Sequence, residues 1–203
     1  KGRLALIPAA GLANPTRSHF QAMELMEQGL VKREATSPQD GWLTRVAQSY
    51  GAHVPCSVLS IGGALPQSLS LCEEALQVAD VWDIAWVPSR TFGDALYKLH
   101  AGDSALDRAS RQALDATGRL EQRLYRNDKN EPTLRDAPKG VQYPDHDFGR
   151  QLNFLAEMLR QNTDIHIASA DLDGWDMHDS QPDRFPSLVR TLSQGLLAFH
   201  DHL

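Results

Sequence analysis

The sequence has few of the features that assign a chain to the simplest protein classes. Only two of its 203 residues are cysteine, Cys56 and Cys72, and they form no Cys-x-x-Cys pair. A disulfide framework needs more cysteines, and a structural zinc knuckle needs closely spaced pairs of ligands. The sequence therefore predicts neither.

Clustered basic charge and long apolar runs are also missing. The formal net charge is -6, and no stretch gathers Lys and Arg, so we expect no nucleic-acid partner, because phosphate contacts need such clusters. The apolar runs, such as residues 4–12, are much shorter than the roughly 20 residues that cross a bilayer, so we expect no membrane span.

The remaining composition is typical of one globular domain. Hydrophobic residues make up 41% of the chain and charged residues 23%, which is enough for one substantial core. We therefore expect residues 1–203 to form a single domain. The chain begins in an apolar run and ends inside an amphipathic pattern, so we interpret it as an internal portion of a longer protein, incomplete at both ends.

Hydrophobic periodicity predicts strands that alternate with helices. We expect strands over 4–12, 54–61 and 165–172, and helices over 18–30, 42–50, 91–100, 104–125, 147–161 and 186–203. This order is typical of an α/β fold with a parallel sheet. Residues 91–126 are expected to be a helical insertion or to cover the sheet, and residues 127–143, rich in Asn, Asp, Lys, Pro and Gly, a surface loop.

Apolar stripes indicate which helix faces are buried. His200 and His202, two apart on the last helix, point in different directions, so both are expected on the solvated surface. The predicted core residues are Phe20, Met23, Met26 and Leu30; Leu106, Ala109, Ala113, Leu120 and Leu124; Phe148, Leu152, Leu155, Ala156 and Leu159; and Leu188, Leu192, Leu196, Phe199 and Leu203.

The loop after the last predicted strand is rich in metal-ligand atoms. Residues two apart in an extended chain project the same way, so the Asp176 carboxylate and the His178 imidazole can converge on one ion, with the Gln181 oxygen close by in sequence. Open α/β sheets bind ligands beyond the carboxyl ends of their strands, where this loop belongs. The alternative is a metal-free polar loop with a solvated His178 and with Trp175 packed against its neighbours.

A second group of candidate residues lies where the first predicted helix begins. Thr16, Arg17, Ser18 and His19 offer two hydroxyls, a guanidinium and an imidazole. A helix N-terminus stabilises anions, so a hydroxyl here is placed to act on phosphate or sulfate. The alternative is that Thr16 or Ser18 only caps the helix and that Arg17 is solvated.

These segments, taken together, resemble a bacterial family known as domain of unknown function number fifteen-oh-one, in the alkaline phosphatase and sulfatase superfamily. The first carries Pro-Thr-Arg-Ser-His-Phe-Gln-Ala over 15–22 and Gly-Trp-Leu over 41–43. The others carry Tyr-Pro-Asp over 143–145 with Phe-Gly-Arg-Gln-Leu over 148–152, and Gly-Trp-Asp-Met-His-Asp-Ser-Gln over 174–181. The chain departs from the family at Asp173, where Gly is usual, and at Met177, where Thr is usual.

The resemblance implies a three-layer α/β/α fold and a hydrolase of small phosphate or sulfate esters, dependent on a divalent metal such as Zn, Mn or Ca. Asp176, His178 and Gln181 would hold the metal, and Ser18, or else Thr16, would be the nucleophile, beside Arg17 and His19. The other family motifs are expected before Lys1 and after Leu203. The resemblance also implies export to the periplasm or cell envelope, and the rival expectation is a non-catalytic exported binding or scaffold protein.

Overall fold

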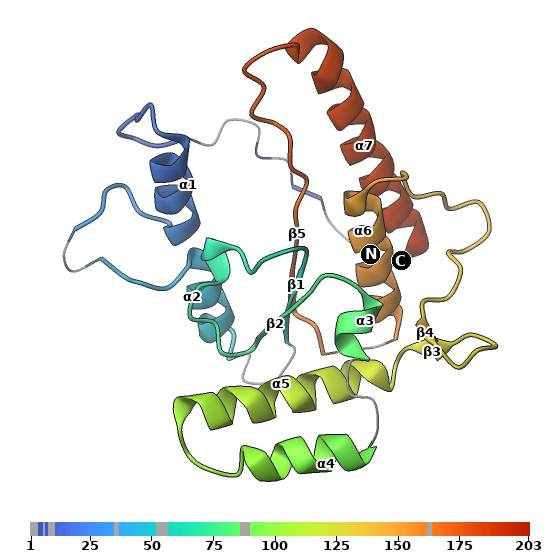
Figure 1. Ribbon diagram of the computed structural model, residues 1–203. Coiled ribbons are helices and arrows are strands. Elements are labelled where there is room, and N and C mark those ends of the chain that lie inside the picture. Colours follow the sequence, from blue (N-terminus) through green and yellow to red (C-terminus); the bar gives the residue numbers. More distant parts are fainter. Residues whose placement is uncertain are drawn as a thin grey trace.

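A short parallel sheet lies at the centre of the computed structural model, which describes residues 4–5, 7, 11–34, 37–51, 57–85, 90–161 and 164–203 (Figure 1). Its middle strand is β1 (Val58–Ile61), which pairs on one side with β2 (Ala75–Val78) and on the other with β5 (Ile167–Ala170). In the register, Leu59 lies opposite Leu76 and Ala168. The predicted α/β class is confirmed.

Both faces of the sheet are covered, as the fully buried β1 requires. Side chains alternate along a strand, so Leu59 and Ile61 lie on one face, where they pack with α3 (Val81–Ile84), α5 (Ala105–Glu121) and α6 (Asp147–Arg160). Val58 lies on the opposite face, in a cluster with Ala47 of α2 (Trp42–Ser49) and Leu69 of the 3-10 helix η1 (Gln67–Leu69). Strand β1 thus contributes residues to an apolar cluster on each face of the sheet.

The long helix α7 (Gln181–His202) packs along α6. Gly195 permits their close approach, because a Cβ atom there would lie 2.9 Å from Cε1 of Phe148. The helix begins five residues before the predicted start at Pro186, which lies inside it. Pro182 lies in the first turn of the helix, where the missing N–H of a proline costs no helical hydrogen bond.

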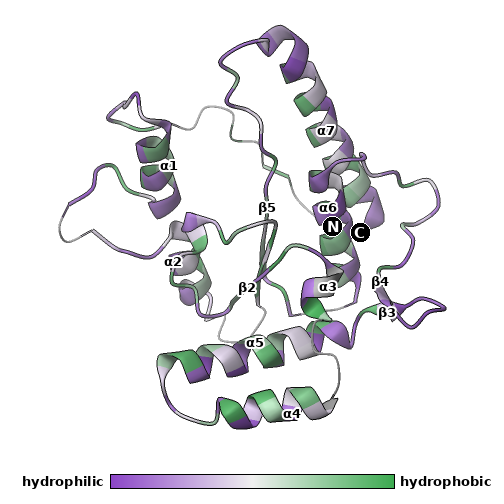
Figure 2. Cartoon of the chain, viewed as in Figure 1, coloured by the Kyte–Doolittle hydropathy of each residue, from purple (hydrophilic) through white to green (hydrophobic). Residues whose placement is uncertain are grey.

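The predicted helical segment at 91–126 consists of α4 (Arg90–Leu99) and α5, which pack against each other. Figure 2 shows hydrophilic and hydrophobic residues side by side along α5, as expected for a helix with one buried face. The predicted stripe on α5 is partly wrong, since Leu120 is buried but Leu106 is 68% exposed. The predicted 127–143 loop contributes β4 (Pro132–Thr133), which pairs with β3 (Tyr125–Arg126) as a hairpin.

The prediction of an opening buried strand over 4–12 is wrong for its described residues. Leu4, Ala5, Ile7, Gly11 and Leu12 lie in no strand, and Leu4 and Ile7 are 70% and 79% exposed. An apolar run becomes a buried strand only when a partner strand supplies its ladder hydrogen bonds, and the sheet order places no such partner beside these residues. Residues 54–56 of the second predicted strand, Cys56 included, lie outside the described residues.

The predicted core stripe on the first helix is also wrong. Helix α1 (His19–Gln28) forms as expected, but Phe20, Met23 and Met26 are exposed, and Leu25 and Gln28 are buried instead. A hydrogen bond to a distant segment accompanies this orientation: Glu27 Oε2 accepts from the backbone N–H of Ser68 at 2.7 Å.

The prediction of a solvated His202 is wrong as well. His202 is 1% exposed, because the last turn of α7 rests on α6 and on the segment that precedes α6. His200 is exposed, as predicted. The described helices include none long and apolar enough to cross a membrane.

Candidate metal centre

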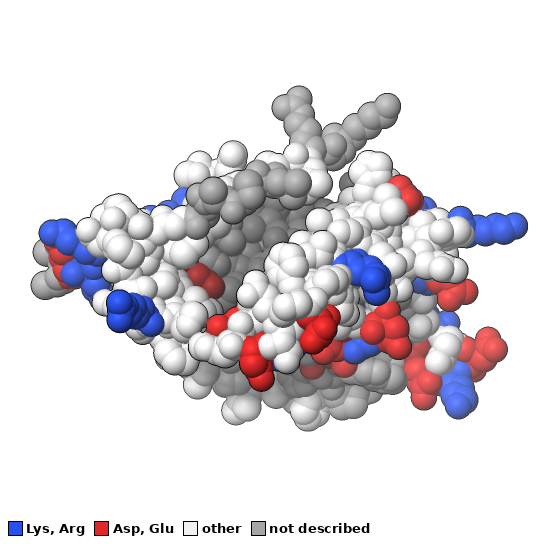
Figure 3. All heavy atoms as spheres, turned by 90° about the horizontal axis from the view of Figure 1, so that it is seen from above, with Lys and Arg blue, Asp and Glu red and all other residues white. Residues whose placement is uncertain are grey.

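The carboxyl ends of the three parallel strands open into a hollow of about 1200 Å³. It is lined by the residues that directly follow each strand: Gly62 and Gly63 after β1, Ala79 and Asp80 after β2, and Asp171 and Asp173 after β5. Figure 3, seen from above, shows a hollow with acidic side chains along its near rim. Parallel strands end at one edge, so chemistry-bearing loops meet there.

The loop between β5 and α7 contacts the start of α1 beside this edge of the sheet. Nε2 of His178 lies 3.1 Å from Oδ2 of Asp176, and Nε2 of His19 lies 3.8 Å from Oδ1 of the same carboxylate. The two imidazole rings meet edge to face, with centroids 5.8 Å apart. One ligand atom from each of the three side chains lies within 4.8 Å of the other two. We call His19, Asp176 and His178 the His/Asp cluster.

The position of His19 follows from how α1 is anchored. Besides the contact of Glu27 with Ser68, Nη2 of Arg45 donates to the backbone carbonyl of Gln28 at 2.6 Å. Both contacts hold the carboxyl end of α1 against η1 and α2, and the start of the helix extends toward the loop after β5. The cluster therefore depends on tertiary packing between segments far apart in the sequence.

The three donor atoms of the cluster suit a divalent metal ion of intermediate hardness, such as Zn²⁺. Two imidazole nitrogens and a carboxylate oxygen are ligands that Zn²⁺ binds at about 2.0–2.2 Å, so two ligand atoms of one ion lie at most about 4.4 Å apart. The His19–Asp176 and His178–Asp176 distances meet this limit. All three side chains are more than half exposed and can adjust by rotation. Ca²⁺ prefers all-oxygen sites and fits less well.

The hydroxyls beside His19 are engaged in capping α1. Ser18 Oγ accepts from the backbone N–H of Gln21 at 3.3 Å. Thr16 Oγ1 accepts from the N–H of Ser18 at 3.2 Å and donates to Oε1 of Gln21 at 2.8 Å. Capping thus accounts for both hydroxyls without a substrate, and the helix start brings Ser18 next to the cluster in sequence.

Arg17 and Gln181 are less closely placed. Both side chains are exposed, and neither makes a hydrogen bond with another described residue. Gln181 is the first residue of α7, so its backbone follows the helix and no longer the extended loop that orients Asp176 and His178. The structure brings His19, instead of Gln181, together with Asp176 and His178. The sequence predicts His19 only as a neighbour of the nucleophile.

Negative charge gathers at the edge of the hollow. The pKa of Asp171 is raised by burial and by the carboxylates of Asp173 and Glu27. Its backbone N–H donates to Oε1 of Gln151 at 3.0 Å, which fixes the start of the loop. The sequence comparison pointed to Asp173 only as a departure from the family pattern, and Asp171 and Glu27 were not among the predicted site residues, although Asp-Leu-Asp directly after a strand was a signal for Asp171.

A second polar group, also missed from the sequence, lies between α6 and α7. Nδ1 of His202 lies 2.9 Å from the hydroxyl of Tyr143, and Nε2 lies 3.9 Å from Oε2 of Glu157, which is itself buried. Burial raises the pKa of the Tyr143 phenol, so the hydroxyl that contacts Nδ1 is neutral. The pKa of His202 is lowered by desolvation and by Arg160, and Glu157 opposes the shift.

Comparison with known proteins identifies no relative: no family model matches the chain, and neither does any curated protein or solved structure.

Proposed function

We propose that this protein is a metal-dependent hydrolase of phosphate or sulfate esters, with a sulfatase-like three-layer fold. The observation that carries the proposal is the approach of His19 to Asp176 and His178 at the strand ends. Two imidazoles and one carboxylate leave coordination positions open, as catalytic zinc sites do. Helices on both faces of the parallel sheet are in keeping with the proposed layers.

The residues divide the chemistry between them. His19, Asp176 and His178 would hold Zn²⁺ or Mn²⁺, which when bound neutralises charge on the ester and favours an ionised nucleophile. Ser18 is the nucleophile favoured by position, since its hydroxyl lies at the start of α1, where free backbone N–H groups and the helix dipole stabilise an oxyanion. Arg17, exposed and without an acceptor among the described residues, would bind the remaining ester oxygens.

The hollow gives room for the rest of the substrate. Asp173 and Gly174 line it, and Asp176 follows two residues later, so an ester held by the cluster can extend into this space. Arg150 and Arg184 also line the hollow, and Arg184 is only loosely paired, with Nη1 at 3.9 Å from Asp179. The substrate favoured is a small ester whose anionic group lies at the cluster.

Turnover tests the proposal directly. We expect the protein to hydrolyse an aryl phosphate or an aryl sulfate when supplied with Zn²⁺ or Mn²⁺, and Asp176→Ala to abolish the reaction. Asp179→Ala is the matched control, because Asp179 is an exposed carboxylate of the same loop outside the cluster. Unchanged turnover in Asp176→Ala would exclude the assigned role.

The second candidate is a non-catalytic exported protein that keeps the fold and binds metal through an exposed cluster. The capping bonds of Ser18 and Thr16 favour it, because neither hydroxyl needs a catalytic explanation. This candidate predicts metal binding without turnover of either ester. The proposed location of both candidates is the periplasm or cell envelope.

A further inference from the structure

A small cavity lies at the carboxyl-terminal ends of α6 and α7, apart from the candidate metal centre. It has a volume of about 270 Å³ and is lined by Arg135, Asp136, Pro138, Glu157, Arg160, Gln161 and His202. None of these residues lines the hollow at the strand ends. Pockets for drug-sized ligands begin at about 300 Å³, so an occupant here is small.

Two buried polar atoms face each other at the inner wall of this cavity. Oε2 of Glu157 and Nε2 of His202 are 3.9 Å apart, which is too long for a hydrogen bond, and both side chains are at least 96% buried. The other oxygen of Glu157 accepts from Nε2 of Gln161 at 2.7 Å. Gln161 is the one hydrogen-bond donor to this buried carboxylate among the described residues, so the wall favours an occupant that donates hydrogen bonds and carries positive charge.

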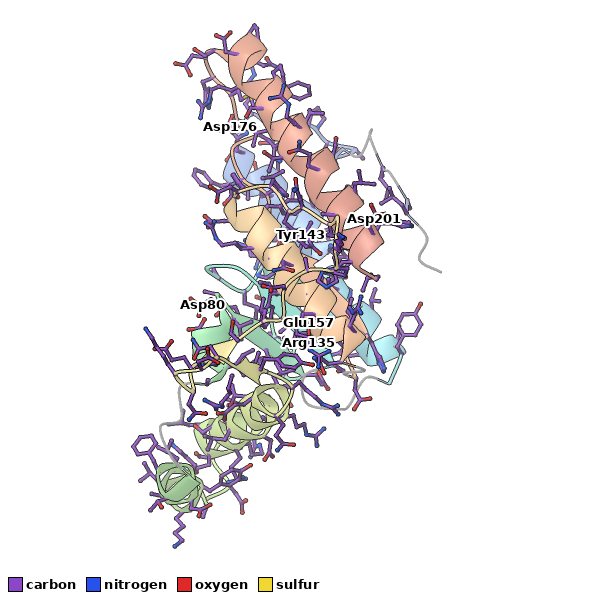
Figure 4. All side chains as sticks on the ribbon, turned by 90° about the vertical axis from the view of Figure 1, so that its right-hand side faces the viewer. Asp80, Arg135, Tyr143, Glu157, Asp176 and Asp201 are labelled. Atoms are coloured by element: carbon purple, nitrogen blue, oxygen red, sulfur yellow. The ribbon has the colours of Figure 1, made fainter. Side chains whose placement is uncertain are left out.

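The mouth of the cavity has the opposite preference. Arg135 and Arg160 are exposed, and Arg160 uses Nη1 to donate to the backbone carbonyl of His202 at 2.7 Å. The guanidinium carbon of Arg135 lies over the ring of Tyr125, 3.8 Å from its centroid, and the guanidinium has no hydrogen-bond acceptor among the described residues. Figure 4 shows Arg135 and Glu157 close together at the same end of α6. A guanidinium that lies over an aromatic ring can still donate its N–H groups to a carboxylate.

We propose that this cavity binds a small zwitterion, such as an amino acid, with its ammonium group at Glu157 and its carboxylate at Arg135. The geometry at Glu157 supports this polarity: Oε2 faces Nε2 of His202 at 3.9 Å, beyond hydrogen-bond distance, so this oxygen can accept from an ammonium group. The lining carries two acidic and two basic side chains: Glu157 and Asp136 repel an anion alone, and Arg135 and Arg160 repel a cation alone.

The experiment uses β-alanine, acetate and ethylamine as probes, each titrated into the isotopically labelled protein. The shift of the His202 ring resonances in the NMR spectrum reports binding. We expect saturable shifts with β-alanine and none with the other two probes at the same concentrations. Equal binding of acetate would show an anion site, equal binding of ethylamine a cation site, and no shift with any probe a purely structural Glu157–His202 contact; each result would overturn the proposal.

Variants separate the two ends of the zwitterion. Arg135→Ala, on an exposed position, should weaken β-alanine binding about tenfold by removing a charge-assisted hydrogen bond. Glu157→Gln should abolish binding while it keeps the side chain's shape and its contact with Gln161. Arg119→Ala, an exposed arginine of α5, is the matched control. Unchanged affinity in Arg135→Ala would contradict the proposal even if Glu157→Gln fails to fold.

Discussion

Nε2 of His19 lies 3.8 Å from Oδ1 of Asp176, although the two residues belong to segments near opposite ends of the chain. Asp176 and His178 can meet through local extended geometry alone. His19 joins them only because α1 is anchored through Glu27 and Gln28 to the other side of the sheet. This pairing extends a two-residue motif to a cluster of three candidate metal ligands.

The contribution of His19 can be measured by thermal stability. A metal that binds only the folded state raises the melting temperature, so Zn²⁺ should stabilise the wild-type protein. His19→Ala should remove most of that stabilisation, since it loses one of three ligands. His200→Ala, which removes an exposed histidine outside the cluster, should keep it. Equal stabilisation of both variants by Zn²⁺ would show that His19 is not a ligand.

Ser18 has a capping role that can be separated from a catalytic one. Ser18→Ala should lower the free energy of unfolding by about 1 kcal/mol, because the N–H of Gln21 loses its acceptor. Ser18→Asn should restore stability, since Asn caps helices as well as Ser does, but it has no hydroxyl to attack an ester. Urea unfolding gives the first quantity and ester turnover the second. A Ser18→Asn variant that hydrolyses the ester at the wild-type rate would exclude the nucleophile assignment.

The buried His202 makes stability sensitive to acid. Its pKa is lowered below 6.5 by desolvation and by Arg160, so the unfolded chain takes up the proton first as the pH falls. The stability contributed by the neutral ring is therefore present above pH 6.5 and decreases as the pH falls below that value. The other groups facing the ring are Tyr143 and Glu157, and Arg135 and Asp136 line the same cavity.

Urea unfolding at a series of pH values between about 7.5 and 5 measures this dependence. We expect the slope of stability against pH to be smaller in His202→Gln than in the wild type. His200→Ala, which removes an exposed histidine of the same helix, should keep the wild-type slope. An identical slope in His202→Gln would contradict the explanation.

Two glycines provide a paired test of the helix packing. Gly195→Ala places a Cβ 2.9 Å from Phe148 Cε1 and 3.1 Å from Leu152 Cδ1, so α6 and α7 must move apart. Gly118→Ala, on α5, meets nothing within 4 Å. Overpacking costs about 1–3 kcal/mol, and Ala in a helix gains up to about 1 kcal/mol over Gly. Gly118→Ala should therefore stabilise the protein, and Gly195→Ala should be less stable than Gly118→Ala by about 1–3 kcal/mol.

Helix α6 shows what sequence periodicity can predict. The periodicity predicts Phe148, Leu152 and Leu155 in the core, and all three are buried. Helix α6 packs between the sheet and α7, so its apolar side chains contact protein on both sides. Helix α1 shows the limit. Periodicity predicts that Phe20 and Met23 share a face, but not which face the rest of the protein covers; the covered face carries Leu25, and Glu27 bonds to the distant Ser68.

The candidate site was predictable to a similar degree. The loop after β5 was expected at the carboxyl edge of the sheet, and the structure places it there, with Asp176 and His178 in contact. The sequence predicts His202 on the surface because a spacing of two residues on a helix shows only that His200 and His202 point in different directions. It does not show which of the two side chains packs against α6. Contacts such as His202 with Tyr143, from a distant segment, leave no local pattern in the sequence.

The most direct test of a shared metal ion is a calorimetric titration of Zn²⁺ into the wild-type protein and into Asp176→Asn. Asp176 is the residue that contacts both histidines, and Asn keeps its shape while it removes the charge. We predict one tight site in the wild type and an affinity lower by at least about 100-fold in the variant, which corresponds to about 2.7 kcal/mol. Equal Zn²⁺ affinity in the two proteins would contradict the assignment of the His/Asp cluster as a metal centre.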